Sequence, residues 1–134
     1  MKEEQSFAAI PTSTEMIARE VIDSALKVHQ ALGPGLLESV YEACLSHELT
    51  KRGIPHARQI AVPITYDGVQ IEAGLRLDIL TDDQVIVELK AVEEMTPLYD
   101  AQLLTYLKST GKRLGLLINF NSTLLKHGLK RMVV

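Results

Sequence analysis

One short run of the sequence carries two opposite charges in an otherwise aliphatic strand. Within residues 85–91, side chains alternate between the two faces of a strand, so Glu88 and Lys90 project together. A carboxylate beside an ammonium group can bind a metal ion and steady the charge that develops on a phosphate. Alone, the pair also fits an ordinary surface ion pair. The preceding strand contains a second carboxylate, Asp78, and the metal-binding interpretation is favoured if Asp78 lies beside Glu88.

The length of the turn between the two strands decides whether the carboxylates meet. With a two-residue turn, the charged side chains of the two strands fall on opposite faces of the sheet. With a three-residue turn at 82–84, Asp78 faces Glu88 and Arg76 faces Lys90. Only this register places the aliphatic residues in one core and the polar residues on the other face, because a slip by one residue flips every side chain. We therefore predict the three-residue turn.

Facing carboxylates at this register would have Cβ atoms about 4.5–5.5 Å apart, which costs stability when both are charged. A divalent cation between Asp78 and Glu88 would remove that cost. Mg²⁺ or Mn²⁺ suits oxygen ligands and keeps several waters available for chemistry. Lys90 could then hold an attacking water. Glu38 has a plainer explanation, because the helix dipole favours a carboxylate in the first turn of its predicted helix.

Hydrophobic periodicity predicts the elements that position these groups. Apolar residues recur every three or four positions in two N-terminal stretches and every second position beyond residue 54. A run that is apolar on both faces, residues 114–120, is typical of a covered parallel strand. The predicted fold is α/β with a mixed sheet of about four to five strands, built from helices at 13–32, 36–52 and 98–110, strands at 60–66, 69–81, 85–91 and 114–120, and a tail at 129–134 that could add a strand.

Local signals predict where these elements begin and end. Thr12 followed by Glu15 resembles a capping box for the first helix. The glycines and prolines that mark other boundaries are Gly33-Pro34-Gly35 after the first helix, Gly53 after the second, Asp67-Gly68 as a hairpin turn, and Thr96-Pro97 and Gly111 at the ends of the third.

Length and composition predict one domain. The chain has 134 residues, of which 46% are hydrophobic, enough for a single continuous core. We expect residues 1–12 to be disordered and residues 13–134 to form the domain. No segment has the apolar length of a signal peptide or membrane span, so we expect a soluble, cytoplasmic protein. The lone cysteine, Cys44, excludes an internal disulfide and is interpreted as a buried structural thiol.

Charge is unevenly distributed along the chain. Residues 1–100 contain 8 Lys and Arg against 17 Asp and Glu, whereas residues 101–134 contain 6 basic residues and no acidic ones. An acidic body beside a basic segment suits a metal site next to a phosphate-contacting surface, although an ordinary solvated face fits equally well. The candidate phosphate contacts are Arg76, Lys108, Lys112, Arg113, Lys130 and Arg131.

Five short motifs follow one another through residues 15–134. The first is Gly35-Leu-Leu-Glu38-Ser-Val-Tyr41, preceded by His29-Gln-Ala-Leu-Gly33-Pro34. The others are Arg76-Leu-Asp78, Val87-Glu88-Leu-Lys90-Ala91, Gln102-Leu-Leu-Thr-Tyr106 and Leu114-Gly-Leu-Leu-Ile-Asn-Phe120. In this combination they resemble the GxxExxY protein family, a bacterial and archaeal group within the PD-(D/E)XK nuclease-like superfamily.

That resemblance implies a restriction-endonuclease-like core of helix, three-stranded meander, helix and strand, with an extra N-terminal helix. It implies that Asp78 and Glu88 are metal ligands, joined by Glu38, and that Lys90 is the catalytic lysine. Gln102 and Tyr106, one helical turn apart, match the QxxxY element beside such sites in RecB-like nucleases. Leu77 stands where the superfamily name has proline.

Two main functions remain open from the sequence. The first is a Mg²⁺- or Mn²⁺-dependent nuclease that hydrolyses phosphodiester bonds of DNA or RNA. Such a nuclease could act as a homodimer, because one small domain offers little surface for binding a duplex. The second is a non-catalytic binding or assembly module that keeps the fold. A weaker third is a hydrolase of small phosphorylated substrates. His29, near the end of the first helix, could contact substrate or be structural, since the dipole favours a cation there.

Overall fold

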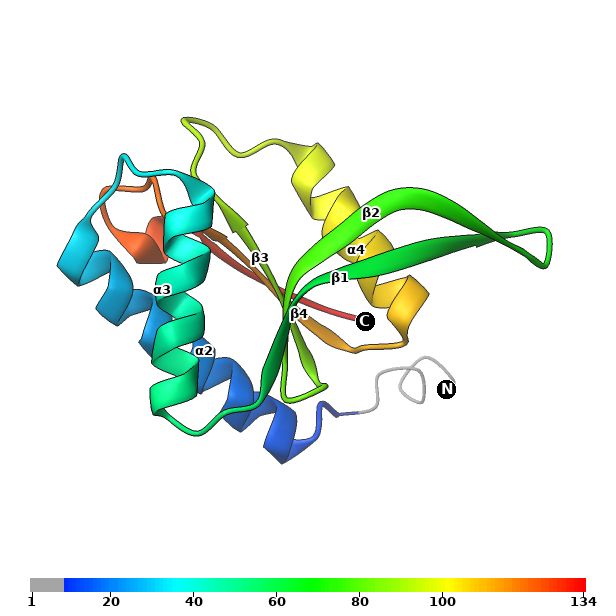
Figure 1. The fold of residues 1–134 in the computed structure, drawn as a ribbon, viewed down its shortest axis with the longest axis horizontal. Coiled ribbons are helices and arrows are strands. Elements are labelled where there is room, and N and C mark those ends of the chain that lie inside the picture. Colours follow the sequence, from blue (N-terminus) through cyan, green and yellow to red (C-terminus); the bar gives the residue numbers. More distant parts are fainter. Residues whose placement is uncertain (1–8) are drawn as a thin grey trace.

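The computed structural model describes residues 9–134, which form a five-stranded mixed sheet with helices on both faces (Figure 1). The sheet order is β1-β2-β3-β4-β5, and every neighbouring pair is antiparallel except β3 and β4. The predicted α/β fold with its restriction-endonuclease-like order is confirmed, and the tail adds the fifth strand. The elements are α2 (Thr12–Leu32), α3 (Glu38–Lys51), β1 (His56–Tyr66), β2 (Val69–Thr81), β3 (Val85–Lys90), α4 (Pro97–Thr110), β4 (Leu114–Asn119), the 3₁₀ helix η1 (Leu125–Gly128) and β5 (Leu129–Val133).

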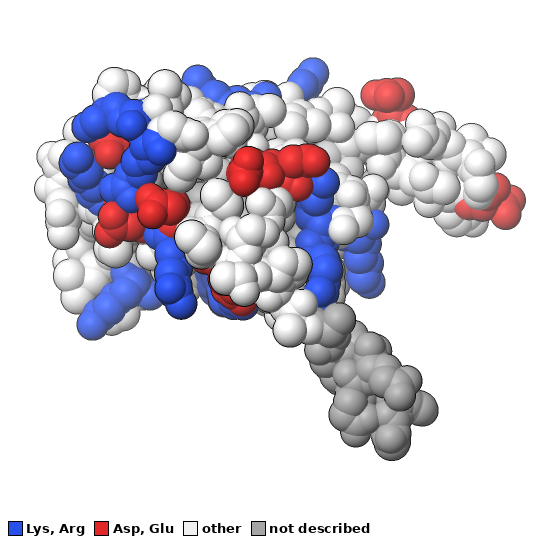
Figure 2. Space-filling view, turned by 90° about the horizontal axis from the view of Figure 1, so that it is seen from below, with Lys and Arg blue, Asp and Glu red and all other residues white. Residues whose placement is uncertain are grey.

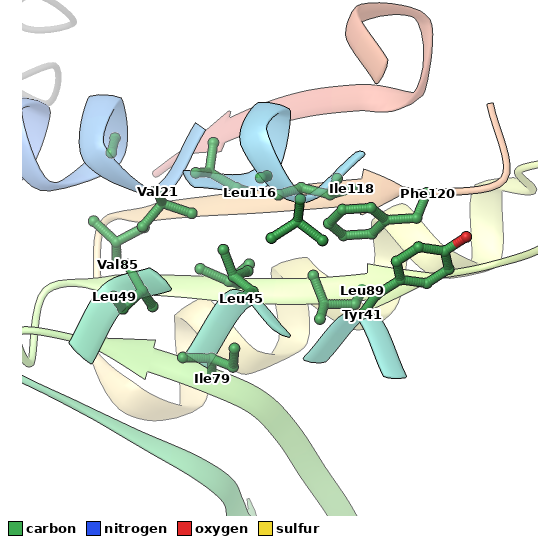
Figure 3. Close-up of a cluster of buried hydrophobic side chains, with 14 of the residues drawn as sticks. Val21, Tyr41, Leu45, Leu49, Ile79, Val85, Leu89, Leu116, Ile118 and Phe120 are labelled. Carbon is green, nitrogen blue, oxygen red and sulfur yellow. The ribbon is translucent and has the colours of Figure 1, made fainter. Parts of the chain in front are cut away.

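The core has two layers because β3 and β4 are covered on both faces. All six residues of β4 are buried, as predicted for a parallel strand after a helical crossover. Helices α2 and α3 pack on one face through a cluster that includes the labelled side chains of Figure 3. Helix α4 covers the other face through Leu103, Tyr106 and Leu107. Any polar group in the middle of this sheet is therefore far from water.

The N-terminal expectation falls mostly outside the described part of the chain. Of the segment 1–12 that we expected to be disordered, residues 1–8 are not described. Ile10 packs against the core, and α2 already begins at Thr12. No helix among residues 9–134 has the length and apolarity to cross a membrane.

The register between β2 and β3 confirms the three-residue turn. Thr81 pairs with Val85 and Ile79 pairs with Val87, so residues 82–84 form the connection. The ladder stops at that pair, however, and Asp78 is no longer a backbone partner of β3. The predicted pairing of charged residues farther along the strands is therefore not formed as a ladder.

One consequence of the parting strands corrects the sequence prediction. We expected the aliphatic residues of β2 to share one face, but Leu77 packs on the α4 side whereas Ile79 packs on the side of α2 and α3. Opposite Asp78, β1 contains a break at Gln59, whose φ is 54°. The break in β1 and the end of the β2–β3 ladder fall at the point where the side chains of β2 change faces.

The predicted capping box at the start of α2 is wrong. The helix is preceded by Pro11 and has no side-chain cap. Glu15 instead forms a two-pronged ion pair with Arg131 of β5, with both N–O distances at 2.7 Å. A bidentate contact to a guanidinium is stronger than a local capping bond, so the long-range partner takes the carboxylate.

The turn between α2 and α3 is fastened by the hydroxyl of Tyr41. This hydroxyl donates to the carbonyl oxygen of Gly33 at 2.5 Å and accepts from the amide of Leu36 at 3.1 Å. The Tyr41 ring stacks on Phe120 of the strand end at a centroid distance of 4.5 Å (Figure 3). Gly35, with φ of 104°, allows the chain to reverse here. Because the turn directly precedes Glu38, it sets where α3 begins.

Replacement of Tyr41 by Phe should loosen this turn without emptying the core. The change removes two hydrogen bonds of a buried hydroxyl and keeps the ring on Phe120. We expect a loss of about 1–2 kcal/mol in the free energy of unfolding, or roughly 3–6 °C in Tm, by calorimetry. Tyr66→Phe is the matched control, since Tyr66 is 72% exposed. Equal Tm values for the two variants would contradict the fastening role.

Candidate active site

The centre of the candidate site is a pair of crossed bonds between β2 and β3. Glu88 accepts the backbone N–H of Asp78 through Oε2 at 2.7 Å, and Asp78 accepts the backbone N–H of Leu89 through Oδ2 at 2.8 Å. These side chains replace the ladder bonds where the strands part. One oxygen of each carboxylate accepts a backbone N–H, and this bond orients the second oxygen, which is Oε1 in Glu88 and Oδ1 in Asp78.

Burial makes this pair of acids electrostatically costly. Glu88 is only 4% exposed. Desolvation, followed by the neighbouring charge of Asp78, raises the pKa of Glu88 to about 8, while Lys90 opposes the shift. Desolvation also raises the pKa of Asp78, although the Leu89 amide opposes it. Two acids whose ionised forms are both disfavoured form a site that a cation would stabilise.

Lys90 leaves β3 on the same side as Glu88. Its Nζ lies 4.4 Å from the centroid of the Tyr99 ring in α4, a cation–π contact. Sequence reasoning missed Tyr99, although its spacing of three residues from Gln102 and seven from Tyr106 places all three on one face of α4.

The two residues of the QxxxY element lie on the helix that covers this face. Tyr106 is fully buried and donates its hydroxyl to the carbonyl oxygen of Arg76 at 3.0 Å. Burial raises the pKa of Tyr106 to about 12, helped by the nearby charges of Glu88 and Asp78. Tyr106 thus keeps its proton and ties α4 to β2 beside the acids, while Gln102 is half-buried one turn earlier.

Helix α3 contributes two acids one turn apart. Glu38 is exposed and accepts the backbone N–H of Ala91 at 3.4 Å, just beyond the end of β3. Its negative charge contributes to the raised pKa of Glu88. Glu42, which sequence reasoning missed, is buried and contributes to the raised pKa of Asp78. The i, i+4 spacing from Glu38 on the predicted helix could have singled it out.

Most of the basic residues predicted to contact phosphate have acidic or backbone partners in the structure. On the face that Figure 2 shows, blue and red side chains lie in several separate groups and do not form one continuous basic surface. Arg76 is exposed next to the site and donates to the Gln59 carbonyl at 2.9 Å. Lys108 is exposed on α4. The other candidates are engaged elsewhere: Lys112 with Asp83, Lys130 with Asp100, Arg131 with Glu15, and Arg113 with the backbone oxygens of Val134 and Ala9.

His29 has a structural contact instead of a position at the acids. Its Nε2 lies 2.7 Å from the carbonyl oxygen of Ser122, and its ring lies 6.4 Å from that of Phe120. It joins the end of α2 to the segment after β4. Cys44, expected to be buried, is only half-buried in α3.

The donor set fits a hard divalent cation in kind. Asp78, Glu88 and Glu38 supply carboxylate oxygens, which Mg²⁺ and Mn²⁺ prefer. Among residues 9–134, no three His, Cys, Asp or Glu side chains converge closely enough to hold a metal ion in the present rotamers. All three acids accept a backbone amide, and the bond to Glu38 is the longest at 3.4 Å, so a metal site here would require Glu38 to turn from Ala91 toward the pair.

Comparison with known proteins gives a match to a family model. The family model that describes the PD-(D/E)XK nuclease superfamily matches residues 15–132, nearly the whole chain. No curated protein sequence matches the chain significantly. No solved structure does so either.

The raised pKa of Glu88 predicts a pH-dependent stability in metal-free protein. Between its ordinary pKa of 4.5 and its folded value of about 8, the native state holds a proton that the unfolded chain has lost. Wild-type stability should therefore fall as pH rises through this window. In Glu88→Gln that loss is absent, so its Tm in EDTA should exceed that of wild type by an amount that grows with pH, to on the order of 5 °C near pH 8.

Glu72→Gln is the control for this measurement, because Glu72 is an exposed carboxylate in the same sheet. Its Tm difference from wild type should stay nearly constant with pH. A Tm difference for Glu88→Gln that does not change between about pH 5 and pH 8 would show that Glu88 titrates normally.

Proposed function

Since this chain belongs to the PD-(D/E)XK nuclease superfamily, we propose that it is a Mg²⁺- or Mn²⁺-dependent nuclease that hydrolyses phosphodiester bonds of DNA or RNA. The observation that carries this proposal is the backbone-oriented pair of half-buried Asp78 and buried Glu88, with Lys90 beside it. An ordinary surface ion pair would be solvated and would leave neither pKa raised. The superfamily assignment supports nucleic acid as the partner.

The proposed roles follow from the positions of the side chains. Asp78 and Glu88, completed by Glu38, are the residues that would hold the cation. A bound divalent cation lowers the pKa of a coordinated water and offsets negative charge on the phosphate. Lys90 would leave the Tyr99 ring to orient the water that attacks phosphorus, while the P–O bond to the leaving oxygen breaks and the proton of the water passes to solvent or to that leaving oxygen.

Other residues would position the substrate and the catalytic strand. Tyr106 holds β2 to α4 at the site, and Gln102 lies one turn away on the same helix. The basic residues predicted to contact the phosphate backbone are Arg76, Lys108, Lys112, Arg113, Lys130 and Arg131; Arg76 and Lys108 are both exposed. His29 is not included, because its ring binds the Ser122 carbonyl.

Three finer assignments belong to the same proposal. The turn fastened by Tyr41 gives a physical reason for the Gly35, Glu38 and Tyr41 spacing and supports membership of the GxxExxY family. A cytoplasmic location and a homodimer on duplex substrates agree with the absence of a membrane-spanning helix in the described residues and with the small size of the domain.

One observation favours a second function, a binding module that has kept the fold without catalysis. In the present rotamers Asp78 and Glu88 each satisfy a backbone amide, and no three acids converge among the described residues. A site used only for structure would look the same. Metal affinity separates the two functions.

Mn²⁺ titration by calorimetry should show binding to wild type that is lost in Glu88→Gln, because the variant keeps the size of the side chain and removes one anionic ligand. Glu72→Gln, a substitution of an exposed carboxylate far along the hairpin, should bind as wild type does. Wild type without measurable binding would favour the non-catalytic module.

Cleavage assays with Lys90→Met should separate catalysis from metal binding. Loss of the ammonium group should lower kcat on DNA or RNA by about 10²–10³-fold while the Mn²⁺ affinity stays within a few-fold of wild type. Lys51→Met is the control, since Lys51 pairs with Glu48 at the end of α3. Full cleavage by Lys90→Met, or by Asp78→Ala, would refute the assigned roles.

A further inference from the structure

Gln59 has a backbone conformation that glutamine rarely adopts. Its φ is 54°, in the left-handed region, although it lies within strand β1. It is the β1 residue opposite Asp78, at the one position missing from an otherwise continuous stretch of the β1–β2 register. Strained residues of this kind persist only where the surrounding structure holds them, and they cluster at functional sites.

The strained backbone lets one amide group bridge two acids. The Gln59 side-chain nitrogen, Nε2, donates to Glu42 at 2.9 Å and to Asp78 Oδ1 at 3.3 Å. Both partners are carboxylate oxygens, so only the NH₂ end of the amide can face them. The bond to Asp78 reaches Oδ1, the oxygen that the Leu89 amide does not use.

The far end of the bridge is itself anchored. Glu42 is 8% exposed, and its second oxygen accepts Nε of Arg58 at 2.9 Å. Both Glu42 oxygens therefore have partners within β1, and the acid is not available as a metal ligand in this arrangement. The Gln59 carbonyl also accepts from Arg76 at 2.9 Å, which secures the strained peptide from the other side.

We propose that Gln59, held by Glu42, is a positioning residue that orients Asp78 Oδ1 for the cation. The proposal rests on the proposed function and deepens it. Leu89 fixes one Asp78 oxygen, while the longer Gln59 bond directs the other and can lengthen further when a cation approaches. Outer-sphere partners of this kind typically contribute about 10–100-fold in metal affinity.

The first variant is Gln59→Gly, because glycine adopts positive φ freely and so preserves the backbone while removing the bridge. We expect Mn²⁺ to bind about tenfold more weakly by calorimetry. At saturating Mn²⁺, kcat should remain within about threefold of wild type, since Gln59 touches neither substrate nor the reacting atoms. Gln59→Met, which keeps the length of the side chain but cannot donate, should show the same loss of affinity.

Gln70→Met is the matched control, because Gln70 is an exposed glutamine on β2 far from Asp78. Its Mn²⁺ affinity should equal that of wild type. Hydrogen exchange in EDTA adds an independent test without metal. The Leu89 amide should exchange faster in Gln59→Gly than in wild type, because Asp78, which accepts the Leu89 N–H, is less restrained in the variant.

The outcomes distinguish this inference from the proposed function. Wild type that binds Mn²⁺ with the same affinity as Gln59→Gly and Gln59→Met would overturn the positioning role and leave the metal site intact. Wild type that does not bind Mn²⁺ would overturn the metal site and the inference together. Weaker binding that accompanies a large drop in Tm in both variants would show a structural role and overturn the inference.

Discussion

The arrangement of the site depends on the point where β2 and β3 stop pairing. Beyond Ile79 and Val87 the backbone amides of the two strands lose their ladder partners inside a covered sheet, and an unpaired buried amide costs about 1–3 kcal/mol. Asp78 and Glu88 supply the missing acceptors. The same two bonds therefore allow the strands to part, keep Glu88 buried and Asp78 half-buried, and orient the remaining oxygen of each acid.

Three other features of the fold position the acids at the end of the β2–β3 ladder. The parallel pair β3 and β4, buried under α2 and α3 on one face and α4 on the other, removes solvent from the acids and raises the pKa of Glu88. The turn closed by Tyr41 starts α3 where Glu38 reaches the end of β3. Tyr106 ties α4 to the backbone of β2. A low-dielectric, preorganised environment of this type favours electrostatic catalysis.

Much of the site could be predicted because strand alternation and turn length are local properties. They placed Glu88 and Lys90 on one face and predicted the connection at 82–84, which the register confirms. The predicted cap of α2 was wrong because Glu15 forms a contact with a residue distant in the sequence. It binds Arg131 instead of capping the helix. For the same reason, Lys112 and Lys130 of the basic C-terminal segment pair with acids from other elements.

By itself, the sequence determined the order of the elements, the mixed sheet and which charged residues leave β3 together, because hydrophobic periods of two and of about 3.6 act over a few residues. Only the tertiary structure decided that the ladder ends at Asp78, that Gln59 takes a left-handed conformation to join Glu42 to that acid, and that Tyr99 underlies Lys90. These contacts bring together α3, β1, β2, β3 and α4. Their geometry depends on how the layers pack, which no local pattern contains.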